Sequence, residues 1–308
     1  MERGMNKVVL VTRKTRLTEL IRKYNTIEQA KFYIEHMGAD FSDYIREDEK
    51  YRKAVEKIMA VSEKYARVQQ IDREFLPNMI FGQNDIVIAT GQDGLVANVL
   101  KYLNGQPLIG VNPDSLRWDG ILLPFEAGEL EGILLKVLGG SHAVKEITMA
   151  QAVTQDGQIM LAVNDLFVGQ KTHVSARYDI TWNGITEYQS SSGVIISTGL
   201  GSTGWYKSVM TQAAGIARKF GGKKLEGERM GWSENSLAFI VREPFPSRAT
   251  GTQIVYGKLT GSDHFKILSK MPENGVVFSD GMENDAVEFN AGTEITIQIA
   301  PKKGILVV

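Results

Sequence analysis

Apolar runs that suit buried strands alternate with helical patterns in the first third of the chain. The runs cover Lys7–Thr12, Ile86–Thr90 and Pro107–Val111. A helical pattern occupies Gly94–Leu103, between the second and third runs. Strands that alternate with helices are typical of a parallel sheet, whose ligands bind at the carboxyl ends of the strands. We therefore predict an N-terminal α/β domain with a parallel sheet.

Two further helices are predicted between the first two strands. Thr26, with Gln29 three residues later, matches a capping box, and Gly38 is placed to end that helix. A second pattern runs from about Ser42 to Tyr65 and is heavily charged. We expect its charged residues to form a solvated face opposite an apolar stripe.

From about Ala143 the chain changes to short runs in which apolar and polar residues alternate. Asp156-Gly157 and Asn183-Gly184 are strong signals for hairpin turns, and one helical interval lies around Thr203–Phe220. The alternating runs are Val144–Ala152, Gln158–Leu166, Tyr178–Trp182, Gly193–Ser197, Ala238–Val241 and Thr293–Ala300. We predict an α/β domain over residues 1–124, then a mostly β domain over residues 125–308, with the boundary near Pro124.

The first candidate site follows the run Ile86–Thr90. Gly91 and Gly94 bracket Asp93, and a helix begins directly afterwards. Glycines let a backbone approach a ligand closely, and the free N–H groups that open a helix attract phosphate. A carboxylate there can take a proton from a hydroxyl group or hold a metal ion. The alternative is an ordinary turn with a solvated aspartate. Asn112 ends the next predicted strand, so it falls at the same edge of the sheet.

A second strand–loop–helix pattern occupies residues 190–205. The strand Gly193–Ser197 leads into a loop rich in Gly, Ser and Thr, which opens a helix at Trp205. The N–H groups and hydroxyls of this loop could cradle phosphate or ribose oxygens, and the indole ring offers a stacking face. The alternative is a capped helix start with a core tryptophan.

Asn164 and Asp165 interrupt an otherwise apolar run between these two patterns. Both side chains are unfavourable to bury unless they are hydrogen-bonded. An amide beside a carboxylate suits the polar edge of adenine or the two hydroxyls of a ribose. The alternative is a β-bulge or a turn.

Composition narrows the classes of function. The 308 residues carry a formal net charge of -1, which gives no electrostatic footprint for nucleic acid or an anionic membrane. The chain has no cysteine, which excludes disulfides and thiolate chemistry, and its 4 histidines lack ligand spacing. No apolar run is long enough to span a bilayer, and the residues before Lys7 leave no room for a signal peptide. We expect a cytoplasmic protein that binds neither nucleic acid nor membranes.

Taken in order, the Gly-x-Asp-Gly turn, the Asn-Asp pair and the Gly/Ser/Thr loop resemble the NAD kinase family. That family carries Gly-Gly-Asp-Gly-Thr, an Asn-Glu pair and Ser-Thr-Pro-Thr-Gly-Ser-Thr-Ala-Tyr. Finer details are most similar to the mitochondrial-type branch, and the resemblance spans about residues 8–308. These details are Val11-Thr12-Arg13-Lys14, Ile109-Gly110-Val111-Asn112 ahead of Gly120 and Leu122-Leu123-Pro124, Ser191-Ser192-Gly193, and Val241-Arg242-Glu243-Pro244 with Arg248.

The resemblance implies a two-domain, NAD kinase-like fold in which the last strand commonly returns to the first, nucleotide-binding domain. It implies transfer of the terminal phosphoryl group of ATP, with Mg²⁺ or another divalent metal ion, to the 2′-hydroxyl of the adenosine ribose of NAD. The partners would then be NAD and ATP, and a homo-oligomer, with a dimer favoured.

The resemblance also assigns roles to residues. Asp93 would be the catalytic base, and no side chain would be a dedicated metal ligand because Mg²⁺ would be held mainly through phosphates. The phosphate and ATP site would be formed by Gly91, Gln92, Gly94, Gly201 and Ser202. The NAD site would be formed by Asn112, Asn164, Asp165, Ser192, Thr203, Gly204 and Trp205. All of these except Asn112 lie in the β-rich domain, which would be the NAD-binding domain.

The chain departs from the family pattern at several of these positions. Gln92 stands for a glycine and Leu95 for a threonine, both at the phosphate-donor site. Asp165 is one methylene shorter than Glu, Gly199 and Leu200 replace Pro and Thr, and Ser192 stands where many bacterial members have Asp. Two alternatives therefore remain beside an NAD kinase. One is an NAD- or nucleotide-binding protein with weak or lost kinase activity, and the other is a kinase of another hydroxylated substrate.

Overall fold

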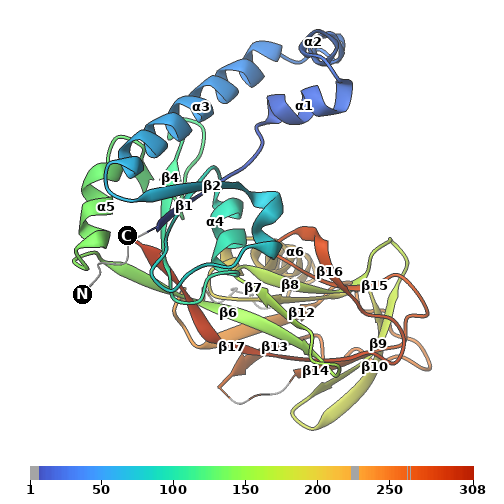
Figure 1. The fold of residues 1–308 in the computed structure, drawn as a ribbon. Coiled ribbons are helices and arrows are strands. Elements are labelled where there is room, and N and C mark those ends of the chain that lie inside the picture. The colour runs from blue at the N-terminus through green and yellow to red at the C-terminus, as the bar shows by residue number, and fades with distance from the viewer. Residues whose placement is uncertain (1–6, 223–228, 262, 264) are drawn as a thin grey trace. The chain divides into compact units, whose positions relative to one another are not determined.

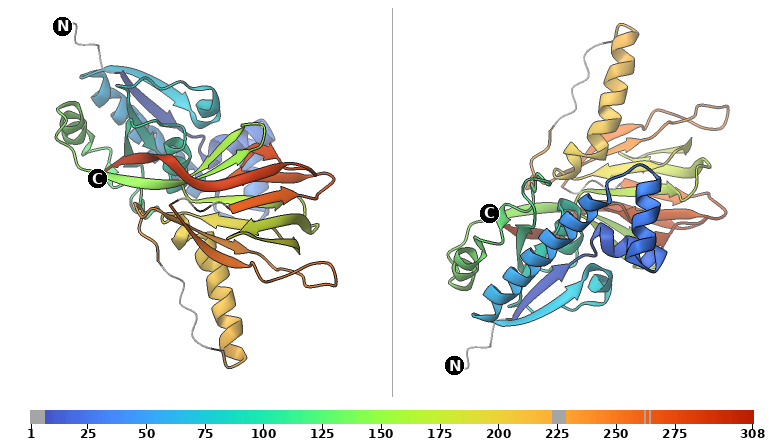
Figure 2. Two further views of the ribbon diagram at one scale, coloured as in Figure 1. Left: turned by 90° about the horizontal axis from the view of Figure 1, so that it is seen from below. Right: turned by 90° about the horizontal axis from the view of Figure 1, so that it is seen from above.

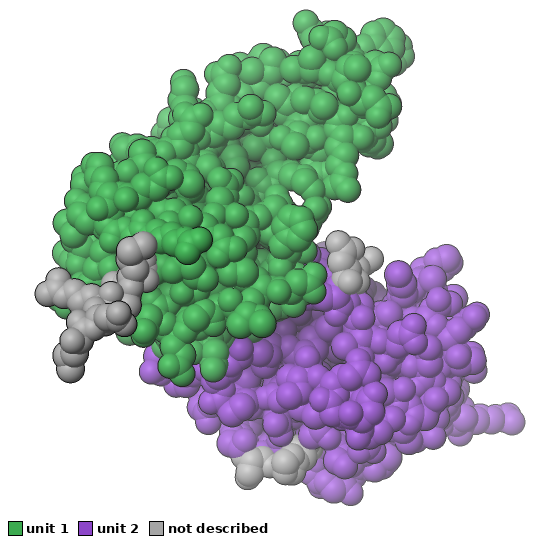
Figure 3. All heavy atoms as spheres, viewed as in Figure 1, with its two compact units in different colours: residues 1–145, 305–308 green, residues 146–304 purple. Residues whose placement is uncertain are grey.

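The chain forms two compact units in a computed structural model that describes residues 7–222, 229–261, 263 and 265–308. Unit 1 comprises Met1–Lys145 and Ile305–Val308, and unit 2 comprises Glu146–Gly304 (Figure 3). The expectation about a signal peptide concerns residues 1–6, which lie outside the described residues. Within the described ranges, no helix is both long and apolar enough to cross a membrane.

Unit 1 is an α/β unit, as the sequence predicts. A parallel sheet has the strand order β2-β1-β3-β4, and β5 also pairs with β4 in parallel (Figure 1). Its elements are β1 (Lys7–Thr12), α1 (Arg16–Tyr24), α2 (Ile27–His36), α3 (Phe41–Glu63), β2 (Arg67–Asp72), the 3₁₀ helix η1 (Arg73–Asn78), β3 (Ile86–Thr90), α4 (Asp93–Leu100), β4 (Pro107–Asn112), β5 (Phe125–Glu126) and α5 (Leu130–Leu138).

The core of unit 1 lies between the sheet and two helices. Val8 of β1 and Ile88 of β3 are fully buried, and they share a cluster with Ile58 of α3 and Leu134 of α5. Every residue of β3 is buried, as expected for a parallel strand covered on both faces. The carboxyl ends of β1, β3 and β4 thus reach one edge of a rigid sheet.

Several elements of unit 1 were not predicted from the local sequence patterns. We predicted no helix at α1, no strand at β2 and no helix at α5. The predicted cap of α2 is confirmed, since Thr26 Oγ1 accepts the N–H of Gln29 at 3.2 Å. The fully solvated face predicted for α3 is wrong at Glu47 and Asp48, which are 3% and 6% exposed.

Unit 2 is mostly β. A six-stranded antiparallel sheet has the order β13-β12-β11-β8-β15-β16, and a second sheet contains β10-β9-β14-β17 with β6 and β7. Its elements are β6 (Val144–Thr154), β7 (Ile159–Ala162), β8 (Asp165–Gln170), β9 (Ala176–Trp182), β10 (Ile185–Ser191), β11 (Val194–Ser197), the 3₁₀ helix η2 (Gly201–Thr203), α6 (Trp205–Lys219), β12 (Ser236–Val241), β13 (Tyr256–Thr260), β14 (Phe265–Ser269), β15 (Gly275–Ser279), β16 (Met282–Glu288) and β17 (Glu294–Val307).

The two sheets of unit 2 pack face to face around one core. Tyr178 of β9 and Phe265 of β14 belong to the first sheet, and Val168 of β8 and Phe239 of β12 belong to the second; all four are fully buried in one cluster. Helix α6 projects from these strands, and Tyr206 is its one buried residue (Figure 2). The sandwich therefore holds the loops between β7 and β8 and between β11 and α6 on a rigid frame.

The hairpin predictions are confirmed, and one strand prediction is not. Asn183 and Gly184 both have positive φ, 51° and 77°, in the turn between β9 and β10. The run Gln158–Leu166, predicted as one strand, is divided into β7 and β8 by a turn at Val163 and Asn164. This places the Asn-Asp pair at the start of a strand and not within one.

The last strand contributes to both units. Ile295 and Ile297 of β17 pair with β14 in unit 2. Ile305 and Leu306 then pair with the beginning of β4, parallel to it, in unit 1. The two units are divided after Lys145, whereas the sequence suggested a boundary near Pro124, because α5 packs into the core of unit 1.

Candidate functional site

In unit 1 the Gly91–Gly94 loop joins the carboxyl end of β3 to the start of α4. Gln92 is the N-cap of α4, but no side chain caps the helix. A Cβ atom on Gly91 would lie 3.1 Å from Leu95 Cδ2 and 3.3 Å from Arg13 Nε, whereas one on Gly94 would meet nothing within 4 Å. The loop is therefore packed tightly beneath Gly91 and open at Gly94. Its free helical N–H groups form a place where an anion can bind.

Asp93 is anchored at this helix start. Its Oδ1 accepts the N–H of Leu122 at 2.7 Å, and Oδ2 makes no hydrogen bond within the described part of the chain. Leu122 is held close to β4 because Gly110 lacks a side chain; a Cβ there would lie 2.0 Å from Leu122 O. One carboxylate oxygen is thus fixed while the other can face a ligand.

Asn112, at the end of β4, fixes the loop that follows it. Its Nδ2 donates to Trp118 O at 2.9 Å, and its Oδ1 accepts the N–H of Asp114 at 3.0 Å. Gly120, with φ 61°, leaves room for this amide. Asp93 and Asn112 are therefore hydrogen-bonded to the same Asp114–Leu123 segment, while the predicted contact of Asn112 with NAD stays a prediction.

The two departures at the donor site have plain structural explanations. Gln92 has φ −126° and ψ 163°, an extended conformation that any residue adopts without strain. Leu95 is 2% exposed and packs against Gly91, so its side chain belongs to the core. Neither substitution distorts the backbone of the loop.

Arg13 lies directly beneath Gly91. Its guanidinium donates to Lys14 O at 3.0 Å and to Glu47 Oε1 at 3.1 Å, and it lies 5.3 Å from the centre of the Tyr51 ring. The side chain is 10% exposed, and its Nε has no hydrogen-bond partner among the residues that the structure describes. A buried positive charge therefore supports the loop at which we expect an anion.

Tyr51, which the sequence analysis did not single out, ties the ends of β1 and β3 together. Its hydroxyl accepts the N–H of Arg13 at 2.8 Å and donates to Thr90 O at 3.1 Å. Burial raises the pKa of Tyr51 to about 12, so the hydroxyl stays protonated and neutral. A tyrosine in a charged helical run carries no signal of this role in the sequence.

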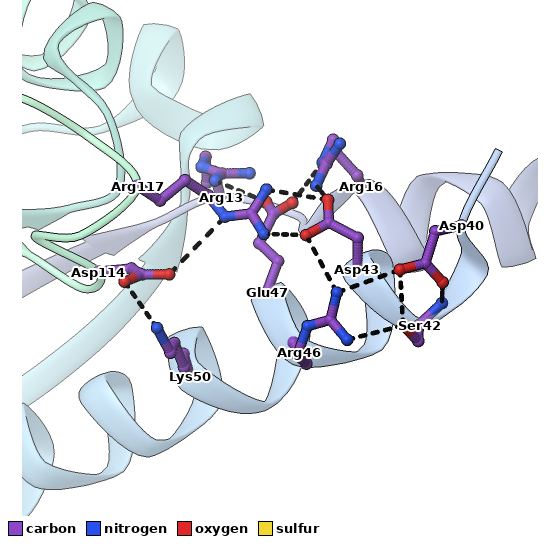
Figure 4. A network of polar contacts seen from close by, with 10 residues as sticks. All are labelled: Arg13, Arg16, Asp40, Ser42, Asp43, Arg46, Glu47, Lys50, Asp114 and Arg117. Atoms are coloured by element: carbon purple, nitrogen blue, oxygen red, sulfur yellow. Dashed lines mark hydrogen bonds and ion pairs between the residues drawn. The ribbon is translucent and has the colours of Figure 1, made fainter.

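An ionic network extends from Arg13 along α3 (Figure 4). Glu47 also pairs with Arg16, and Asp43 accepts hydrogen bonds from Arg16 at 2.8 Å and from Arg117 at 3.0 Å. These two guanidinium groups hold the pKa of Asp43 well below its usual range. The network links α3 to the segments that follow β1 and β4, and Arg13 is its member next to Gly91.

In unit 2 the Asn164–Asp165 turn and the loop after β11 are hydrogen-bonded to each other. The N–H of Thr198 donates to Asn164 O at 2.9 Å, and Thr198 Oγ1 donates to Val163 O at 2.6 Å. A Cβ on Gly201 would lie 2.0 Å from Asn164 O. These contacts bring two of the predicted motifs together, with a glycine at their closest approach.

The Thr198–Gly204 loop uses its hydroxyls internally. Ser202 Oγ donates to Gly199 O at 2.7 Å and is buried, while Thr203 Oγ1 donates to Leu200 O at 3.4 Å. Gly204 is the N-cap of α6, and no side chain caps that helix. The groups that this loop presents to a ligand are therefore mainly backbone N–H groups.

Trp205 is a partly buried residue at the start of α6. Its ring stacks on Phe167 with centroids 5.6 Å apart, and the Arg242 guanidinium lies 5.2 Å from its centre. Ser192 donates its N–H to Arg242 O at 2.9 Å, which places it beside this group. Part of the ring therefore serves the core, as the alternative interpretation held, and part remains accessible.

Asp165 has an unusual environment for a carboxyl group. It is 9% exposed, and its side chain accepts no hydrogen bond among the described residues. Burial, followed by the negative charge of Asp280, raises the pKa of Asp165 to about 7. Asp280 lies outside every motif found in the sequence, where Asp280-Gly281 looks only like a hairpin turn.

Similarity to known proteins covers part of the chain. No protein-family profile matches it. The NAD kinase of Chlorobium limicola is 32% identical over 130 residues, 40% of this chain and 44% of that protein. The NAD kinase of Caldanaerobacter subterraneus is 29% identical over 143 residues (42% and 47%), and that of Saccharolobus solfataricus is 26% identical over 151 residues (49% and 54%). The chain thus matches about half the length of these curated relatives.

Solved structures resemble the whole chain. Yeast NADH kinase complexed with NADH has a TM-score of 0.61 at 16% identity, covering 100% of this chain and 85% of that chain. An NAD kinase from Archaeoglobus fulgidus in complex with ATP has a TM-score of 0.57 at 16% identity, covering 98% and 93%. These likenesses confirm the predicted fold class, an α/β unit with a parallel sheet followed by a mostly β unit.

Proposed function

We propose that this protein is an NAD kinase, which transfers the terminal phosphoryl group of ATP to the 2′-hydroxyl of the adenosine ribose of NAD. The observation that carries the proposal is Asp93, a carboxylate with one anchored oxygen at the uncapped start of α4. The sequence relatives named NAD kinase and the shared fold support it. The detailed motifs also favour the mitochondrial-type branch of that family.

The donor phosphates would bind at the Gly91–Gly94 loop. The N–H groups at the start of α4 favour negative charge, and the space above Gly94 is open. Arg13 adds a positive charge below Gly91. Gln92, which adopts an extended conformation, borders the loop without straining it. This combination supports a triphosphate as the donor, and ATP is the nucleotide we propose.

Asp93 would act as the base for the acceptor hydroxyl. Its free Oδ2 takes the proton from the 2′-O–H, and the oxygen then forms a bond to the terminal phosphorus of ATP. The bond from that phosphorus to the bridging oxygen breaks, and ADP leaves. Such a reaction asks the protein mainly for positioning and for neutralisation of charge.

A divalent metal ion would enter with the phosphates. Within the described ranges, no group of three or more His, Asp or Glu side chains is arranged to hold an ion. The free oxygen of Asp93 is assigned to the acceptor hydroxyl, so the ligands of the ion would be mainly phosphate oxygens and water. Mg²⁺ is the ion we propose, since it favours such ligands and retains several waters.

The acceptor nucleoside would bind to unit 2. Asn164 and Asp165 offer an amide and a carboxyl group, and the start of α6 offers backbone N–H groups beside Trp205. Ser192 and Arg242 border that ring. The chemistry suits a nucleotide with a hydroxylated ribose. A homodimer in the cytoplasm is the state that the family resemblance favours, and we propose it on that basis.

The experiment that tests this function measures NADP formed from NAD, ATP and Mg²⁺. Asp93→Asn should lower kcat by about 10²- to 10⁴-fold, the usual contribution of a general base, because the amide cannot take the proton. The control is Asp119→Asn, since Asp119 is an exposed aspartate in the segment after β4. Full activity of Asp93→Asn would refute the assigned role.

The same experiment separates the alternatives. Absence of NADP formation by the unaltered protein, with NAD still bound, would favour a nucleotide-binding protein with lost activity. Other phosphoryl donors and other hydroxylated acceptors would then be assayed in turn. The extended conformation of Gln92 and the buried position of Leu95 support the kinase to this extent, that neither residue strains the loop.

A further inference from the structure

Asp280 occupies the two-residue turn between β15 and β16. Ser279 pairs with Met282, and both turn residues have positive φ, 54° for Asp280 and 69° for Gly281. These are the angles of a tight hairpin, for which Asp-Gly is a favoured sequence. An Asp-Gly pair therefore suits the backbone of this turn, and the Asp280 carboxylate also reaches a second turn.

The Asp280 carboxylate accepts hydrogen bonds from three successive backbone N–H groups of the β7–β8 turn. Its Oδ1 accepts from Asn164 at 2.6 Å, from Val163 at 3.1 Å and from Asp165 at 3.3 Å, and its Oδ2 accepts from Val163 at 3.1 Å. The N–H of Asp280 donates in return to Asp165 O at 3.0 Å. Charged acceptors make the stronger hydrogen bonds, so this contact fixes the turn firmly.

The Asn164 peptide is consequently held from both sides. Its N–H donates to Asp280, and its carbonyl accepts from Thr198 with Gly201 packed against it. The side chains of Asn164 and Asp165 project from a backbone that cannot rotate freely. The anchor and the turn are 116 residues apart in the sequence, which explains why no motif revealed it.

We propose that Asp280 is the positioning residue of the nucleoside site, holding Asn164 and Asp165 in the orientation in which they bind the substrate. This inference rests on the proposed function, because the ligand it serves is the nucleoside of the phosphoryl acceptor. Asp280 acts through the backbone N–H groups of Val163, Asn164 and Asp165, to which its carboxylate bonds. The role is therefore distinct from those of the residues already assigned.

The charge of Asp280 has a second consequence for the site. Ser197, which pairs with Asp165 on β11, and Ser279 on β15 are uncharged, and neither β7 nor the Thr198–Gly204 loop contains a titratable residue. Asp280 is thus the charged group that faces Asp165 from these elements. With a pKa of about 7, Asp165 is largely a neutral acid below that pH. In that form it can donate a hydrogen bond to a ring nitrogen or a ribose oxygen.

The test compares Asp280→Asn with Asp156→Asn. Asp156 occupies the Asp-Gly hairpin between β6 and β7, and among the described residues its carboxylate bonds within that hairpin, to Thr154 and Gln158. We expect Asp280→Asn to raise the Kd for NAD at least tenfold, about the loss when a charged hydrogen bond is weakened, with the affinity for ATP unchanged. Asp156→Asn should leave both affinities unchanged.

A ¹³C NMR titration of the carboxyl groups measures the titration midpoint of Asp165, which a general loss of stability would not shift. In the unaltered protein one aspartate, absent in Asp165→Asn, should titrate near pH 7, and in Asp280→Asn its midpoint should shift to lower pH. If Asp280→Asn does not fold, Asp280→Glu is the second variant, because it keeps the charge and moves the carboxylate by one methylene away from the N–H groups that it accepts. An NAD affinity of Asp280→Glu equal to that of the unaltered protein would then overturn the proposal.

The outcomes separate this proposal from the proposed function. Unchanged NAD affinity and an unchanged Asp165 midpoint in Asp280→Asn would overturn the positioning role even in an active kinase. An unaltered protein that binds NAD without forming NADP would contradict the kinase and leave the binding comparison fully valid. A protein that binds no nucleoside would contradict both.

Discussion

A single methyl group at Gly201 should disrupt the contact between two motifs of the candidate site. In Gly201→Ala the added Cβ would lie 2.0 Å from Asn164 O and 2.6 Å from Asn164 C, and real Cβ atoms essentially never come closer than 3.0 Å. The Asn164 peptide must therefore move by at least about 1 Å. Both elements are backbone, so no flexible side chain can absorb the shift.

The magnitude follows from the hydrogen bonds that this shift weakens. Asn164 O accepts from Thr198 N at 2.9 Å, and Val163 O accepts from Thr198 Oγ1 at 2.6 Å, in buried surroundings. Each bond left unmade costs about 1–3 kcal/mol, so we expect a loss of roughly 2–6 kcal/mol in the free energy of unfolding. A displacement near 1 Å also predicts a loss of about 100-fold in kcat/KM for NAD.

The assay is denaturant unfolding followed by NAD titration, with Gly215→Ala as the control. Gly215 lies inside α6, where an added Cβ meets nothing within 4 Å. This replacement should leave NAD binding unchanged and raise stability by about 0.5–1 kcal/mol, since alanine favours helices over glycine. A Gly201→Ala protein that is as stable as the unaltered one and binds NAD equally well would refute the reasoning.

Two further predictions concern the charges of unit 1. Arg13→Gln should raise the KM for ATP by about tenfold or more and leave the KM for NAD constant, because a nearly buried positive charge next to Gly91 is lost. The control is Arg46→Gln, since Arg46 is an exposed arginine on α3. Equal effects of the two replacements on the KM for ATP would contradict a local role of Arg13. Asp43→Asn should lower the free energy of unfolding by roughly 1 kcal/mol at pH 7, with Asp119→Asn unaffected. Because folding lowers the pKa of Asp43, this stabilisation is present above its unfolded value of about 4 and is lost as the pH falls further, so unfolding curves at several pH values should converge in acid. A difference that persists at low pH would point to packing as its source.

Strong local patterns were sufficient for much of the fold. The strands around Val87 and Leu108 and the Asn183-Gly184 turn could be predicted because periodicity and turn chemistry reside in neighbouring residues. Strand β2 and helix α5 could not, since their stability comes from pairing with β1 and packing into the core. The split of Gln158–Leu166 likewise depends on Asp280, which is far away in the sequence.

The candidate site, like the fold, has features that the sequence predicts and features that appear only in the tertiary structure. The sequence by itself determined that Asp93 stands between two glycines at a helix start, and that an Asn-Asp pair precedes a Gly/Ser/Thr loop. Only the tertiary structure decided that Asp93 is anchored by Leu122, and that Asp280 faces Asp165. The physical reason is that strand order sets which distant groups share hydrogen bonds and charge. A local pattern contains the donors and acceptors, but not their partners.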